Sequence, residues 1–148
     1  MTSSAREISF LLLHNKLPVL ERLFRIGLRT DPYCEECPGA EICDTEHFFC
    51  TCVRVSEVWR WIKLQVCDLL GEPIDDLSLL KYKIPLWTSK KLEITWLLGC
   101  YYEKAWTDIA IKGVKTLRFE PFFGYLTFKY KSDQMGARPT FLIPALIQ

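Results

Sequence analysis

The chain of 148 residues contains no apolar run that approaches the roughly 20 residues needed to cross a membrane. Its most apolar stretch, residues 94–102, has charged residues directly on both sides. The seven glycines are scattered, so no glycine-rich loop is available to hold phosphate groups. Histidine is also scarce, and His14 has the features of a helix-end residue rather than of a catalyst. These absences argue against a membrane protein and against the common nucleotide-binding enzymes.

A secretory signal peptide is another missing feature. The early apolar run at residues 8–13 is short, and no basic segment or small-residue cleavage site accompanies it. An odd number of cysteines, seven, fits reduced thiols better than disulfide pairs. We therefore expect an intracellular protein of the nucleus or cytoplasm, without membrane contact, whose thiols are available to a metal. The content of 49% apolar and 25% charged residues is ordinary for one globular domain or two small lobes.

Four potential metal ligands lie within a short segment, in the pattern Cys34-x2-Cys37-x9-His47-x4-Cys52. Two cysteines separated by two residues can present both thiolates to one ion from a tight turn, and the later His and Cys can close a tetrahedral shell. Three soft thiolates and one imidazole match the ligand preference of Zn²⁺. The spacing therefore predicts a zinc site.

The identity of the fourth ligand is open on this reasoning. If a helix begins near Thr45, taken as its N-cap, then His47 and Cys50 are three residues apart and share a face. Cys50 is then a rival to Cys52. Cys43 is a possible replacement for one of the first two cysteines.

Charge is unevenly distributed, although the whole chain carries only +1. Residues 1–30 carry +3, residues 31–80 carry −8 and residues 81–148 carry +6. The acidic section includes the metal motif itself. Because acidic surfaces repel phosphate, any contact with nucleic acid is expected on the basic second half.

Hydrophobic periodicity predicts a mainly α-helical fold with a small zinc-knuckle loop between helices and a helical C-terminal half. The expected helices run from Ser3 or Ser4 toward residue 14, over 18–27, over 53–70, from Thr88 or Ser89 toward residue 113, and over 118–131, where a strand is the alternative. Asp76 is expected to cap a further helix. We divide the chain into a zinc-binding module, residues 1–71, and a basic extension, residues 72–148, that packs on it. The apolar segment 141–147 is expected to dock or fray.

The segment 17–59 resembles the zinc-binding module near the C-terminal end of non-LTR retrotransposon reverse transcriptases. The resemblance rests on the order and spacing of Leu17-Pro18, Arg22-Leu23, Gly27-Leu28, Asp31-Pro32-Tyr33-Cys34, Cys37, Asp44-Thr45-Glu46-His47-Phe48-Phe49, Cys52 and Trp59. Carried over by position, it implies Cys34, Cys37, His47 and Cys52 as the zinc ligands. Apart from the resemblance, Phe48, Phe49 and Trp59 are expected to pack as apolar mass that shields the metal.

The resemblance implies a role in RNA or DNA engagement, with the remainder of a reverse transcriptase polyprotein as a partner. It does not extend to polymerisation, which needs carboxylates that hold two metal ions. Only Asp75 and Asp76 are adjacent aspartates, the aromatic-x-Asp-Asp pattern is absent, and the chain is too short for a polymerase palm and fingers. We therefore expect a module without enzymatic activity of its own.

Basic residues of the second half are the candidate nucleic-acid contacts, namely Lys90, Lys91, Lys112, Lys115, Arg118, Lys129 and Lys131. Lysine and arginine supply salt-dependent phosphate contacts, and exposed aromatic rings near them can stack on bases. The alternative function is a zinc-stabilised protein-interaction domain of a host gene, without nucleic-acid contact. A basic face would favour the first function, and an exposed apolar patch with scattered lysines would favour the second.

Overall fold

The computed structural model describes residues 3–84 and 90–132, and within these ranges the chain is mainly α-helical, as predicted. Two of the helical segments, η1 and η2, have π-helical geometry. The elements are α1 (Ser3–Leu13), α2 (Leu20–Arg25), η1 (His47–Thr51), α3 (Ser56–Leu70), α4 (Asp76–Leu80), α5 (Lys91–Ala105), η2 (Trp106–Ile111) and α6 (Phe119–Ser132). The described residues contain no strand, and one isolated antiparallel bridge joins Tyr33 to Ile42.

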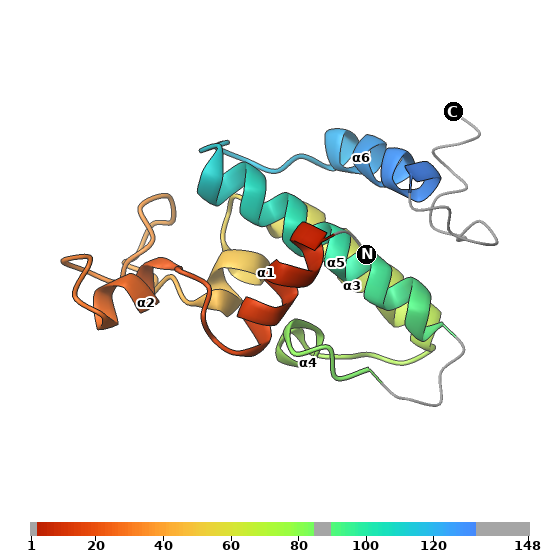
Figure 1. The fold of residues 1–148 in the computed structure, drawn as a ribbon, viewed down its shortest axis with the longest axis horizontal. Helices are drawn as coiled ribbons and strands as arrows, with labels where there is room; N and C mark the ends of the chain where they lie inside the picture. The colour runs from red at the N-terminus through yellow and green to blue at the C-terminus, as the bar shows by residue number, and fades with distance from the viewer. Residues whose placement is uncertain (1–2, 85–89, 133–148) are drawn as a thin grey trace.

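Helix α5 lies at the centre of the molecule and packs against α1, α3 and α6 (Figure 1). Its buried residues cover most of its circumference, which is typical of a helix enclosed by others. Leu97, Leu98, Tyr101 and Tyr102 are all completely buried. The hydroxyl of Tyr102 donates to the carbonyl of Leu79 at 2.8 Å, so even the polar atom of this core residue is satisfied.

Helix α3 is amphipathic and supplies the second wall of the core. Val58, Ile62 and Val66, which are four residues apart, have no exposed surface. The helix ends at Gly71, whose φ of 74° gives the left-handed C-cap that glycine adopts without steric cost. It begins at Ser56, three residues later than predicted, because Cys52 has an extended backbone (φ −63°, ψ 139°) that separates η1 from α3.

Residues 119–132 form helix α6, which confirms the predicted helix over the alternative strand. Phe122 and Leu126, one turn apart, are completely buried. Trp61 on α3 meets α6 in three edge-on ring contacts, with centroid distances of 5.2 Å to Phe119, 6.4 Å to Phe122 and 5.4 Å to Phe123. Aromatic packing therefore fixes α6 beside α3.

The long helix predicted toward residue 113 is two segments. Regular α-helix ends at Ala105, and η2 continues with i→i+5 hydrogen bonding, as the bond from the N–H of Lys112 to the carbonyl of Thr107 at 2.9 Å shows. Gly113 follows with a φ of 71°. Lys90 occupies the N-cap position of α5, and the predicted caps Thr88 and Ser89 lie outside the described residues.

Two predicted helix caps are wrong by one residue. The side chain of Asp75, rather than Asp76, accepts the N–H of Ser78 at 2.8 Å and caps α4. Asp76 instead accepts the indole N–H of Trp59 at 3.1 Å and pairs with the ammonium of Lys63 at 2.9 Å. A carboxylate thus links α4 to α3, an interaction that only the tertiary structure reveals.

The second wrong cap prediction concerns the helix that carries His47. Asp44, rather than Thr45, caps it, because its carboxylate accepts the N–H of His47 at 2.8 Å. In addition, α2 begins two residues after Pro18, at Leu20, although it ends before Gly27 (φ 82°) as predicted.

A single hydrophobic cluster includes residues from both sides of position 71, among them Leu12 and Ile62 on one side and Leu97 and Phe122 on the other. The division of the chain into a zinc-binding module, residues 1–71, and a basic extension, residues 72–148, stays a prediction. The apolar segment 141–147 lies outside the described residues. Among the helices that the structure describes, none combines the length and apolar character required to cross a membrane.

Candidate metal centre

The first half of the centre is held by the bridge between Tyr33 and Ile42. The N–H of Cys34 donates to the carbonyl of Glu41 at 2.8 Å, and the N–H of Cys43 donates to the carbonyl of Pro32 at 2.9 Å. Successive side chains of extended backbone point to opposite faces. Tyr33 and Ile42 are therefore exposed, while Cys34 and Cys43 are buried.

The second half of the centre is the π-helical segment η1. The N–H of Cys52 donates to the carbonyl of His47 at 2.8 Å, an i→i+5 bond. This wider turn brings residue 52, five positions after the histidine, to the same site as the imidazole. The rival ligand Cys50 was considered on the assumption of regular α-helical spacing, in which residues three apart share a face. In the structure Cys50 is buried in the hydrophobic core outside the ligand group.

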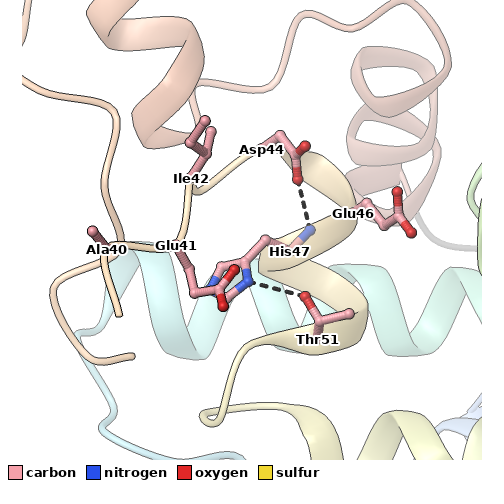
Figure 2. Close-up of a pocket in the computed structure, with 7 residues that line it drawn as sticks. All are labelled: Ala40, Glu41, Ile42, Asp44, Glu46, His47 and Thr51. Carbon is pink, nitrogen blue, oxygen red and sulfur yellow. Dashed lines mark hydrogen bonds between the residues drawn. The ribbon is translucent and has the colours of Figure 1, made fainter. Parts of the chain in front are cut away.

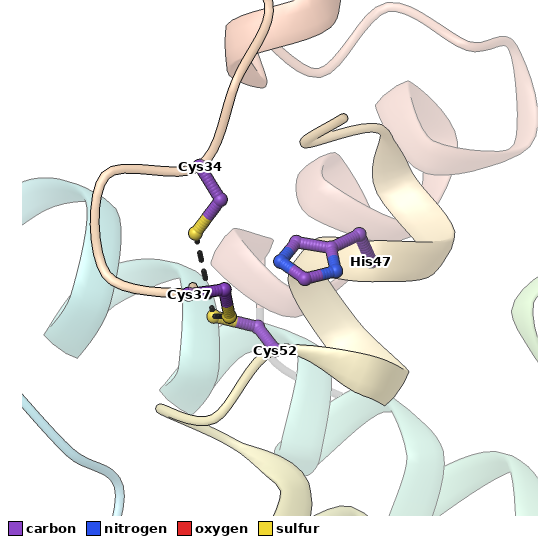
Figure 3. A group of neighbouring side chains, drawn as sticks. All are labelled: Cys34, Cys37, His47 and Cys52. Atoms are coloured by element: carbon purple, nitrogen blue, oxygen red, sulfur yellow. Dashed lines mark hydrogen bonds between the residues drawn. The ribbon is translucent and has the colours of Figure 1, made fainter. Parts of the chain in front are cut away.

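Cys34, Cys37, His47 and Cys52 come together as one group, with their ligand atoms all within 4.8 Å of one another (Figure 3). The Sγ atom of Cys52 lies 3.9 Å from that of Cys34 and 3.8 Å from that of Cys37. A regular tetrahedron with Zn–S bonds of about 2.3 Å has S···S edges of about 3.8 Å. Both of these S···S distances therefore fit a tetrahedral zinc ion. None of the seven cysteines, all within the described ranges, forms a disulfide.

The imidazole of His47 supplies an independent test of the fit. Its Nδ1 atom lies 2.9 Å from the hydroxyl of Thr51. Its Nε2 atom is buried and, among the described residues, has no hydrogen-bond partner. Figure 3 shows one ring nitrogen directed toward the three sulfur atoms. A buried nitrogen without a partner is unfavourable unless it binds an ion, and an Nδ1 hydrogen bond to an acceptor is the usual support of a metal-bound Nε2.

Arg54 contacts the group from the side of the polypeptide that leads into α3. Its Nε atom donates to the Sγ of Cys52 at 3.1 Å, and its Nη2 atom lies 3.8 Å from the Sγ of Cys34. The guanidinium carbon also lies 5.7 Å from the centre of the Phe48 ring. The backbone carbonyl of Arg54 accepts the N–H of Leu117 at 2.7 Å, which ties the loop before α6 to the metal centre.

Hydrogen bonding and charge divide the cysteines into two kinds. Burial acts to raise the pKa of Cys34, but backbone hydrogen bonds from Glu36 and Cys37, the nearby His47 ring and the charge of Arg54 lower it to about 6. Burial and the neighbouring thiols of Cys52 and Cys34 raise the pKa of Cys37 to about 11.

The two cysteines considered as alternative ligands have thiols of the inert, buried kind. Burial raises the pKa of Cys43 to about 12, and burial also raises the pKa of Cys50. Neither thiol belongs to the group of four whose ligand atoms come together. The surroundings of Cys34 favour its thiolate.

The aromatic residues of the motif are core residues, as predicted. Phe48, Phe49 and Trp59 are buried. Phe48 packs on Trp106 with a centroid distance of 5.1 Å, and the hydroxyl of Tyr101 donates to the backbone carbonyl of Phe49 within η1. Helix α5 and segment η2 thereby support the π-helical turn that carries the histidine.

The outer surface beside the centre is acidic. An open pocket of about 430 Å³ lies on the solvent side of the imidazole, between the residue 40–44 loop and η1 (Figure 2). Three carboxylates line it with no lysine or arginine among the described lining residues, which are Ala40, Glu41, Ile42, Asp44, Glu46, His47 and Thr51. This polarity agrees with the expectation that phosphate groups avoid the knuckle.

The predicted nucleic-acid contacts separate into two groups. Lys112, Lys115 and Arg118 are exposed on the segment between η2 and α6. Lys90 and Lys91 lie at the start of α5, which is about 22 Å long and has this segment beyond its other end. Helix α6 runs back along α5, and Tyr130 contacts Trp96 at a centroid distance of 6.4 Å. Lys129 and Lys131, on either side of Tyr130, therefore lie toward the start of α5. The seven candidate contacts are therefore spread along the length of α5.

Comparisons of the chain with protein-family models, with curated proteins and with solved structures give no match. The metal centre is consequently defined by its geometry alone, as a buried Cys₃His group that could hold a metal ion.

Three residues that support the centre were not identified from sequence. Thr51 orients the imidazole, Arg54 contacts two sulfur atoms and Tyr101 binds the backbone of η1. Thr51 lies within the motif and Arg54 two residues after it, so their position in the sequence was a signal. Tyr101 is 52 positions from its partner, and nothing in a single sequence indicates that pairing.

Proposed function

We propose that this protein is a zinc-stabilised helical module in which Cys34, Cys37, His47 and Cys52 hold one Zn²⁺. The observation that carries the proposal is the buried Nε2 atom of His47, which lacks a partner among the described residues and faces three sulfur atoms with tetrahedral spacing. A zinc ion there would join the residue 34–37 turn to η1 and to Cys52 directly after it.

The role of the ion in this proposal is structural. Catalytic zinc sites usually have three protein ligands and leave a position for water or substrate. Here four side chains are close enough to close the shell, and the core covers much of the group. We therefore propose a module that has no enzymatic activity of its own.

The test of the zinc proposal is metal analysis of the purified full chain and of two variants. Wild-type protein should contain one equivalent of zinc, and His47→Ala should lose it. Cys67→Ser, at a half-buried position outside the ligand group, is the matched control and should retain it. Stoichiometric zinc in the His47→Ala protein would contradict the ligand assignment.

The proposed role of the module is to support RNA or DNA engagement, as the resemblance to non-LTR retrotransposon reverse transcriptases implies. The structural support is the segment 112–118, where Lys112, Lys115 and Arg118 are all exposed. The buried side chain of Leu117 and its N–H bond to the carbonyl of Arg54 fix this basic segment to the metal centre. Three nearby cations suit weak, non-specific phosphate binding, with a Kd no tighter than about 1 μM at physiological salt.

Charge reversal tests this role. A variant with Lys112, Lys115 and Arg118 changed to Glu should lose single-stranded RNA binding and have a smaller salt dependence, because each lost phosphate contact removes about 0.7 from the slope. The matched control changes Glu35, Glu36 and Glu41 to Lys on the acidic knuckle. Unchanged RNA binding and salt slope in the first variant would exclude segment 112–118 as the contact.

A second candidate function is protein interaction, in which the zinc module binds a partner protein without nucleic acid. Exposed apolar side chains favour it, since several lie directly beside the predicted basic contacts. Leu92 is 82% exposed next to Lys91, and Ile111 is 69% exposed next to Lys112. If the wild-type chain has no measurable affinity for single-stranded RNA, and a partner protein binds wild type but not Ile111→Ser, this function is selected.

A further inference from the structure

With zinc bound, the four ligands of the metal centre would leave a negative charge that they do not neutralise. One Zn²⁺ bound by three thiolates and a neutral imidazole carries one net negative charge. Cys34, His47 and Cys52 are buried, so water screens this charge poorly. A buried charge without a partner is costly, and an opposite charge at hydrogen-bond distance is the usual remedy.

Arg54 occupies the position that such a partner requires. Its Nε–H reaches the Sγ of Cys52 at 3.1 Å and its Nη2 lies 3.8 Å from the Sγ of Cys34, so one guanidinium contacts two of the three sulfur atoms. Guanidinium is weakly hydrated and keeps its charge when partly buried, which suits it to this task better than an ammonium group.

The surroundings hold the guanidinium in place. Its carbon lies 5.7 Å from the centre of the Phe48 ring, at cation–π distance, and the backbone of the same residue is fixed by the hydrogen bond from Leu117. None of the ion pairs found among the described residues joins Arg54 to a carboxylate. Its charge is therefore directed at the thiolates rather than shared with an acidic neighbour.

We infer that Arg54 is the counter-charge of the metal centre, and that it makes the zinc–thiolate group electrically neutral and tightens its hold on the ion. This inference rests on the proposed zinc site, and it goes beyond it by assigning a positioning residue that is not itself a ligand. Sulfur atoms that accept charge-assisted hydrogen bonds remain good zinc ligands, while the cost of burying their negative charge falls.

The experiment measures zinc affinity of the full chain by competition with a chromophoric chelator, for wild type, Arg54→Met, Arg54→Lys and Arg60→Met. Methionine keeps an apolar stem against Phe48 but removes the charge. Arg60 is exposed on α3, which makes its variant the matched control. Substitution of Co²⁺ for zinc, with its visible absorption, reports whether tetrahedral thiolate coordination persists in each protein.

Arg54→Met should bind zinc about 10- to 100-fold more weakly than wild type, as is common for residues that support metal ligands, while its cobalt spectrum stays tetrahedral. Arg54→Lys should lose less, because it keeps the charge, and Arg60→Met should match wild type. Zinc affinity of Arg54→Met within two-fold of wild type would overturn the inference. So would equal losses in Arg54→Lys and Arg54→Met, because charge would then be irrelevant.

Two further outcomes separate the inference from the proposed function. If the wild-type chain binds neither zinc nor cobalt, the proposed metal site itself is refuted and the role of Arg54 falls with it. If Arg54→Met does not fold, as judged by helical circular dichroism, the comparison of Arg54→Lys with wild type decides: an affinity loss above about 100-fold despite the retained charge would reject the counter-charge role.

Discussion

The choice between Cys50 and Cys52 depends on one local feature, the π-helical turn η1, and a matched pair of substitutions tests it. We expect Cys52→Ala to lose tight zinc binding and Cys50→Ala to retain it. If η1 were regular α-helix, residue 50 would share the face of His47 and the result would be reversed. The two cysteines are two positions apart and both are buried, so burial alone does not separate them.

The expected magnitudes differ widely. Structural zinc contributes on the order of 10–16 kcal/mol of apparent binding free energy, or about 2.5–4 kcal/mol for each of four ligands. Loss of Cys52 should thus weaken zinc binding by a factor of about 100 to 1,000. Cys50→Ala removes one buried sulfur atom and should cost about 1 kcal/mol of folding stability, with metal affinity nearly unchanged.

The assay is chelator competition for zinc affinity, combined with thermal unfolding of the zinc-loaded proteins. Cys52→Ala should lower both quantities, and added excess zinc should restore part of its stability by mass action. Full zinc affinity in Cys52→Ala, with weak binding in Cys50→Ala, would refute the π-helical turn and the ligand set derived from it.

Three further perturbations probe the supports of the fold and the centre. Thr51→Val removes the hydrogen bond to Nδ1 of His47 and should weaken zinc binding about 10-fold in the same competition assay, whereas Thr51→Ser should not. Tyr101→Phe leaves the carbonyl of Phe49 without its donor and should lower the free energy of unfolding by about 1–3 kcal/mol in a denaturant titration; no change would contradict that role for η1. Burial raises the pKa of Tyr82 to about 12, above its unfolded value of about 10. Its protonated form therefore stabilises the fold below pH 10, that contribution is lost as pH rises to about 12, and unfolding of Tyr82→Phe should be less sensitive to pH in this window than that of wild type.

The helices could be predicted from sequence because their signals are local. Period-four apolar positions such as Val58, Ile62 and Val66 identify α3, and Gly71 marks its end. The predicted helix boundaries were less accurate where either of two neighbouring residues could serve as the N-cap. Asp75 and Asp76 have the same side chain, and the partners Trp59 and Lys63 decide which one caps α4.

The ligand pattern of the metal centre was also present in the sequence, since the spacing from Cys34 to Cys52 already allows a tetrahedral group. Only the tertiary structure decided between Cys50 and Cys52. That choice requires an i→i+5 turn, and the Tyr101 hydroxyl, from a helix about 50 positions later, binds the backbone of the turn. Likewise, net charge identified a basic second half, but the antiparallel return of α6 along α5 determined that its cations lie in two groups. Local patterns fix which residues can bind a metal or form a helix, whereas contacts between distant segments fix which of them meet.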